Sequence, residues 1–141
     1  MHIICKTISL CLYLIIGVVS MMMAHKSIFS NRFLPFHEQA AGTSWESIDP
    51  GVQSVLRALM KISGLGFLTV GLLLIILSIM SFFGQDSLVQ YILPGIVLLF
   101  CLGLFFVNHQ LAVQTKANTP WKGSLAAAML IGIAIILSVI K

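Results

Sequence analysis

Charged residues are scarce in this sequence. Only 9% of its 141 residues are Asp, Glu, Lys or Arg, whereas 59% are hydrophobic, and the mean hydropathy is +1.07. Soluble domains carry about 25% charged residues, so this chain has too few to cover a surface that faces water. The composition excludes an ordinary soluble fold and predicts an integral membrane protein, which we expect in a bacterial inner (plasma) membrane.

Three further absences narrow the function. No Asp, Glu, Lys, Arg or His lies at the centre of a hydrophobic segment, and such residues are the usual sign of proton relays and ion-coupled transport. No basic run is interleaved with aromatic residues, which disfavours nucleic acid as a partner despite a net charge of +4. Cys5, Cys11 and Cys101 have neither disulfide nor metal-ligand spacing, so we expect them to be small hydrophobic residues that face lipid or neighbouring helices.

Four hydrophobic segments are long enough to cross a bilayer as helices. Their continuous rather than alternating pattern excludes a β-barrel, and at 1.5 Å per residue each crosses the roughly 30 Å hydrocarbon layer. The predicted fold is all-α: one domain, residues 1–141, forming an up-down bundle of four transmembrane helices. The spans cover about residues 7–24, 62–83, 88–107 and 123–140.

The first connection, about residues 25–61, is a long polar loop whose second half is predicted to be helical. Asp49 can cap a helix that has Pro50 in its first position. We expect this amphipathic extension to lie at the membrane interface and to lead into the second span. Its first part would either project into the headgroup layer or bend, with Gly64 and Gly66 as candidate bend points. Its polar stripe is formed by residues four apart: Gln53, Arg57 and Lys61.

The other two connections are shorter. The sequence Gly84-Gln85-Asp86-Ser87 predicts a tight turn that makes the second and third spans antiparallel neighbours. A medium loop, about residues 108–122, precedes the fourth span. Its end, Thr119-Pro120-Trp121, repeats the helix-start signal, with Thr119 as the cap and Trp121 at the membrane interface.

Small residues predict where the spans pack together, because helices in lipid associate through close backbone approach. Gly95 and Gly103 of the third span are the expected counterpart of a stripe on the fourth. That stripe consists of residues four apart: Ser124, Ala128 and Gly132.

Basic residues bear on the orientation. An even number of spans places both termini on one side, with Lys6 and Lys141. The positive-inside rule predicts that the termini lie outside, whereas Lys6 before the first span argues for the reverse, so both orientations stay open. The opposite side carries six basic residues: Lys26, Arg32, Arg57, Lys61, Lys116 and Lys122.

In either orientation, residues 25–61 and 108–122 meet on one face of the membrane, which we call the polar rim. We expect Phe33, Phe36 and Trp45 to dip into the headgroup layer there. The predicted function is non-catalytic binding or assembly at this rim, with membrane lipids, a small hydrophobic molecule, a partner membrane protein or a second copy. The candidate binding residues are His25, His37, Glu38, Trp45, Glu46, Arg57, His109 and Trp121.

The competing interpretation is a membrane-embedded redox enzyme or subunit that depends on a metal or a quinone. His25, His37 and His109 would be the metal ligands, since imidazole together with the carboxylate of Glu38 suits zinc, iron or copper. No two of these histidines have a ligand spacing on one element. The leading interpretation therefore assigns no catalytic residue and no cofactor.

The run FHEQAAG at residues 36–42, followed by Trp45, by Asp49-Pro50-Gly51 and by Thr119-Pro120-Trp121, resembles small bacterial four-span membrane proteins whose function is not characterised. In size and layout the chain is also similar to DoxX-like proteins. The resemblance covers the whole chain and implies the four-span helical fold, but it implies no activity.

Overall fold

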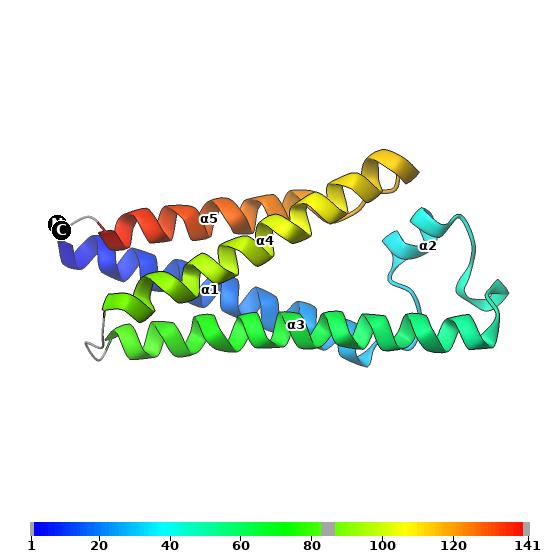
Figure 1. Ribbon diagram of the computed structural model, residues 1–141, viewed down its shortest axis with the longest axis horizontal. Coiled ribbons are helices and arrows are strands. Elements are labelled where there is room, and N and C mark those ends of the chain that lie inside the picture. The colour runs from blue at the N-terminus through cyan, green and yellow to red at the C-terminus, as the bar shows by residue number, and fades with distance from the viewer. Residues whose placement is uncertain (1, 83–86, 140–141) are drawn as a thin grey trace.

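The computed structural model describes residues 2–82 and 87–139, and all secondary-structure elements in these residues are helices (Figure 1). Four of them are long and apolar enough to cross a membrane. This confirms the predicted all-α class with four hydrophobic helices. Residues 84–86 of the predicted tight turn lie outside the described residues. The long helices are α1 (His2–Phe29), α3 (Pro50–Phe82), α4 (Ser87–Thr115) and α5 (Trp121–Val139).

The helices extend beyond the predicted spans toward the polar rim. α1 continues past residue 24 to Phe29, and α4 continues past residue 107 to Thr115. Hydropathy predicts only the apolar stretch of a helix. The helix itself continues beyond that stretch until a residue with non-helical backbone angles ends it. α4 is interrupted at Lys116, which has a φ of 56° and donates its amide hydrogen to the carbonyl of Ala112 over 2.9 Å. The α4–α5 connection is therefore shorter than the predicted loop of residues 108–122.

The start of α3 is confirmed in atomic detail. The Asp49 carboxylate accepts hydrogen bonds from the amides of Gly51 at 2.8 Å and Val52 at 3.3 Å, and Pro50 is the first helical residue. From there α3 runs straight to its end (Figure 1). This view shows no kink along α3, which favours a projecting first part of the helix over a bend at Gly64 or Gly66.

Thr119 does not cap α5. Its hydroxyl donates a hydrogen bond of 2.7 Å to the backbone carbonyl of Asn108 in α4, so it fastens the α4–α5 connection to the preceding helix. α5 begins at Trp121, and the carbonyl of Pro120 accepts hydrogen bonds from the amides of Gly123 and Ser124.

Helix α1 lies at the centre of the packing. It packs along α3 and α5, and α5 packs against α4, whereas α3 and α4 touch sparingly and diverge toward the polar rim (Figure 1). Two hydroxyl groups of α1 reinforce this arrangement: Ser9 donates to the carbonyl of Ala134 in α5 at 2.8 Å, and Ser20 donates to the carbonyl of Phe67 in α3 at 2.7 Å. The buried centre includes Tyr13, Leu74, Val97 and Ile131.

Two glycine contacts bring the backbones of α1 and α3 together. A Cβ atom on Gly71 would lie 3.0 Å from the carbonyl oxygen of Gly17, and one on Gly64 would lie 2.6 Å from Cγ1 of Ile28. The glycines predicted as packing residues are different: among the described atoms, nothing lies within 4 Å of a Cβ on Gly95, Gly103 or Gly132. That prediction was wrong for the glycines, although Ala128 of the same stripe is buried.

Gly71→Val should destabilise the fold by about 1–3 kcal/mol, since the new side chain meets backbone that cannot move aside. Gly103→Val is the matched control, because open space surrounds a Cβ at that position. Thermal unfolding in detergent, followed by circular dichroism, measures both variants. Equal melting temperatures for the two would show that close approach of α1 and α3 is not limiting for stability.

Candidate functional site

A short helix occupies the space between the diverging ends of α3 and α4 (Figure 1). Helix α2 (Pro35–Ala41) lies within the segment that was predicted as polar loop. Pro35 takes its first position, and Gly42, with a φ of 64°, ends it. Proline at the start and glycine just past the end are a sequence signal for a helix, so α2 could have been predicted from the sequence.

The segment after α2 folds around Trp45, which is only 7% exposed. The Phe33 ring lies edge-on at 4.8 Å, and the Arg57 guanidinium lies 5.7 Å from the indole centroid. Gln53 of α3 donates to the carbonyl of Trp45 at 2.8 Å, while the Glu38 carboxylate accepts the Trp45 amide hydrogen at 3.4 Å. The expectation that Trp45 dips into the headgroup layer was wrong, because it is buried in protein. We call these five residues the Trp45 cluster.

The Trp45 cluster fixes one side of α2 to α3. On the other side, the side-chain oxygen of Gln39 accepts the amide hydrogen of Asn118 at 2.9 Å, in the α4–α5 connection. Helix α2 therefore bridges the two halves of the molecule at the polar rim. Three of the predicted binding residues, Glu38, Trp45 and Arg57, stabilise this bridge through contacts within the protein.

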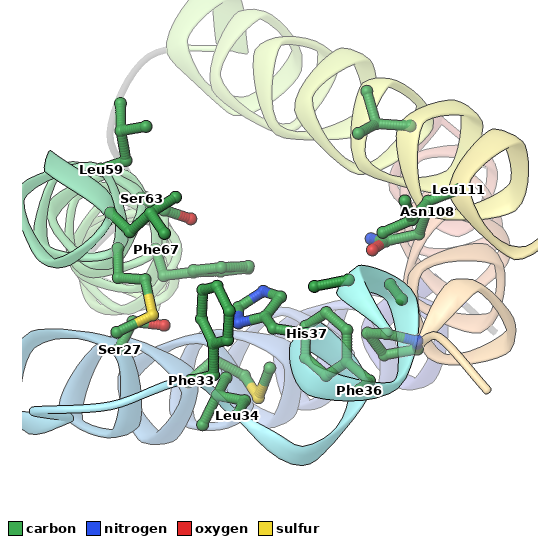
Figure 2. A pocket seen from close by; sticks show the side chains of 17 residues that line it. Ser27, Phe33, Leu34, Phe36, His37, Leu59, Ser63, Phe67, Asn108 and Leu111 are labelled. Atoms are coloured by element: carbon green, nitrogen blue, oxygen red, sulfur yellow. The ribbon is translucent and has the colours of Figure 1, made fainter. Parts of the chain in front are cut away.

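A cavity of about 510 Å³ lies beneath α2, between α3 and α4 (Figure 2). We call it the outer cavity. Its volume falls in the range of about 300–1,000 Å³ that is typical of small-molecule sites. None of its described wall residues is Asp, Glu, Lys or Arg. Apolar side chains form most of the wall, and the polar ones are Ser27, His37, Ser63 and Asn108.

His37 stands near the middle of this view (Figure 2). Its ring packs against those of Phe36 and Phe33, with centroids 4.0 Å and 5.6 Å away. Its Nδ1 atom is buried and has no hydrogen-bond partner in the part of the chain that the structure describes. Burial lowers the pKa of His37, because the apolar surroundings disfavour the charged imidazolium. An unsatisfied buried nitrogen is uncommon and costly in proteins.

A second cavity of about 210 Å³, the inner cavity, lies deeper among the four long helices. The two cavities adjoin, since both have Met23, Phe67, Asn108 and Pro120 on their walls. The remaining walls of the inner cavity come mainly from apolar residues, among them Val70, Phe100, Leu104 and Ala127.

The other predicted site residues are not on the walls of the outer or the inner cavity. His25 is exposed on α1 and packs beside Phe29, with ring centroids 4.8 Å apart. His109 is exposed on α4 and lies edge-on to Trp121 at 5.4 Å. Glu46 is exposed in the short 3-10 helix η1 (Trp45–Ser47). Only His37 of the eight candidates lines the outer cavity.

The three histidines of the metal hypothesis are not brought together. Among residues 2–82 and 87–139, no three His, Cys, Asp or Glu side chains form a group that could hold a metal ion. The geometry therefore gives the proposed ligand set His25, His37 and His109 no support.

Three polar wall residues were not predicted from the sequence: Ser27, Ser63 and Asn108. Ser27 and Asn108 follow the predicted hydrophobic spans, and Ser63 lies at the start of one, all at the level of the polar rim. Single neutral residues at such positions are common, so a convergence of three helices on one cavity was needed to reveal them.

Comparison with protein-family models, with curated proteins and with solved structures gave no match. The layout similarity to DoxX-like proteins stays a prediction.

The pKa of His37 has a consequence for stability. Its folded pKa is below the ordinary value of 6.5, so the unfolded chain binds a proton first as the pH falls. Stability should be highest above about pH 6.5 and should decline as the pH falls through the lowered pKa. His37→Phe keeps an aromatic ring against Phe36 and should reduce this decline.

Melting temperatures in detergent across this pH range measure the effect. His109→Phe is the matched control, because that ring is exposed, and it should retain the decline of the unmodified protein. An undiminished decline in His37→Phe would contradict the assignment to His37.

Proposed function

We propose that this protein binds a small, mostly apolar molecule in the outer cavity, without catalysing a reaction. The observation that carries the proposal is a cavity of about 510 Å³ whose described wall has no charged side chain and includes His37, a histidine whose Nδ1 atom is buried and unpartnered among the described residues. A largely apolar pocket with a few polar groups is the usual form of a small-molecule site.

We further propose that the protein is an up-down bundle in a bacterial inner membrane, and that the first part of α3 is an amphipathic extension at the membrane interface. Large apolar side chains are exposed on all four long helices, including Val18, Ile76, Leu99 and Ile136, and they would contact lipid. Because α3 and α4 diverge where the outer cavity lies, a ligand dissolved in the bilayer would enter sideways between them.

The cavity lies beneath the polar rim and not on its surface. The sequence predicted binding at the surface of the polar rim, through eight candidate residues. The geometry favours a cavity under that rim and retains His37 alone among the eight as a wall residue. A partner membrane protein or a second copy would instead have to use an outer surface, and nothing on the described surface favours one over the other.

Ser63→Trp tests the proposal, because Ser63 lies on the cavity wall and a tryptophan there would occupy the space. The adjacent Ile62 is exposed and is not on the wall, so Ile62→Trp is the matched control. Protein purified in a mild detergent is analysed by native mass spectrometry for retained small molecules. The unmodified protein and Ile62→Trp should retain a bound molecule, and Ser63→Trp should retain at least about tenfold less.

Circular dichroism and size-exclusion chromatography verify that all three proteins are folded. The same retained amount in Ser63→Trp and Ile62→Trp would place the bound molecule elsewhere and would refute the proposal. A retained molecule that carries a quinone absorption band would identify the occupant expected from the redox hypothesis.

A further inference from the structure

We propose that the ligand is a single-chain amphiphile whose uncharged head group carries both a carbonyl-type oxygen and a hydroxyl, as a monoacylglycerol does. Its head group would lie in the outer cavity between His37 and Asn108, and its hydrocarbon chain would enter the inner cavity. This inference rests on the proposed function and specifies the chemistry of the occupant.

The absence of charge on the walls determines the charge of the head group. Neither cavity has an Asp, Glu, Lys or Arg among its described wall residues. The outer cavity is open on one side, but a phosphate or carboxylate between its walls would lose part of its hydration without gaining a counter-charge, which costs more than placing a neutral group there. Arg57 lies in the Trp45 cluster, against the indole ring and Gln53, and not on the wall. The ligand head group is therefore uncharged.

The hydrogen-bonding groups on the walls define the head group further. A neutral imidazole carries one N–H group, and buried N–H groups without an acceptor are rare. Since Nδ1 of His37 is buried and unpartnered, the proton belongs on Nε2, where it can be donated to a ligand oxygen. His37 thus calls for an acceptor such as a carbonyl.

Asn108 calls for the complementary group. Its side-chain nitrogen donates to the carbonyl of Leu104 at 2.9 Å, and its side chain points into the outer cavity from α4, across from Ser63 and Phe67 (Figure 2). The amide oxygen is left to accept a hydrogen bond, which a ligand hydroxyl can donate. A head group with one carbonyl and one hydroxyl satisfies both walls.

The inner cavity sets the shape of the rest of the ligand. It adjoins the outer cavity at Asn108 and Phe67, and its volume is about 210 Å³. A dry apolar cavity of about 150 Å³ accepts a molecule the size of benzene. The inner cavity therefore has room for part of one hydrocarbon chain, but not for two chains side by side.

Binding to the full-length protein in detergent micelles tests this inference, with native mass spectrometry as the readout. Four probes are compared: a monoacylglycerol, a lysophosphatidic acid with the same chain, a diacylglycerol and a short-chain quinone. The monoacylglycerol should bind at least about tenfold more tightly than the lysophosphatidic acid. His37→Phe should weaken monoacylglycerol binding about fivefold, as expected for the loss of one hydrogen bond.

The position of the chain has its own matched pair of variants. Ala127 lies on the wall of the inner cavity, whereas the adjacent Ala126 is exposed. Ala127→Leu should weaken the binding of long-chain monoacylglycerols more than that of short-chain ones, and Ala126→Leu should leave both unchanged. Equal effects of Ala127→Leu on all chain lengths, or none, would refute the placement of the chain.

The remaining outcomes separate the two proposals. Preferred binding of the lysophosphatidic acid, the diacylglycerol or the quinone, abolished by Ser63→Trp, would refute this inference and leave the proposed function intact. If no probe and no retained molecule depends on Ser63, the proposed function fails and this inference fails with it.

Discussion

The close approach of α1 and α3 determines the rest of the architecture. Without side chains at Gly17 and Gly71, the two backbones come into direct contact, and this contact is the most extensive in the molecule. α5 takes another side of α1, and α4 packs mainly on α5. α3 and α4 are thus held by different partners and can separate toward the rim, and the outer cavity lies in the resulting space.

The polar loop completes this space rather than merely connecting two spans. Trp45 serves as a small core of its own, since Phe33, Gln53 and Arg57 surround it with aromatic, hydrogen-bond and cation–π contacts. Its burial holds α2 in place, and α2 brings His37 over the cavity. The polar and aromatic residues of the Trp45 cluster, which the sequence suggested as ligand-binding groups, therefore hold the imidazole of His37 in position.

Much of the fold was predictable, because hydropathy and helix-start signals act locally. Four hydrophobic helices and the Asp49–Pro50 start of α3 were predicted correctly. The glycines at the helix contacts were not predicted correctly. Whether a glycine allows close packing depends on which helix lies opposite it, and the spacing of residues in the sequence does not contain that information. Similarly, the structural work of Trp45 and the convergence of His37 and Asn108 depend on tertiary contacts. The start and end of α2, by contrast, had a local signal in Pro35 and Gly42.

The hydrogen bond between Gln39 and the amide of Asn118 gives α2 a mechanical role. One side of α2 is attached to α3 through the Trp45 cluster, and the other is attached to the connection that follows α4. Any change in the separation of α3 and α4 must therefore stretch, tilt or detach α2. The position of α2 therefore depends on the separation of α3 and α4, and the geometry of the outer cavity beneath it depends on that separation as well.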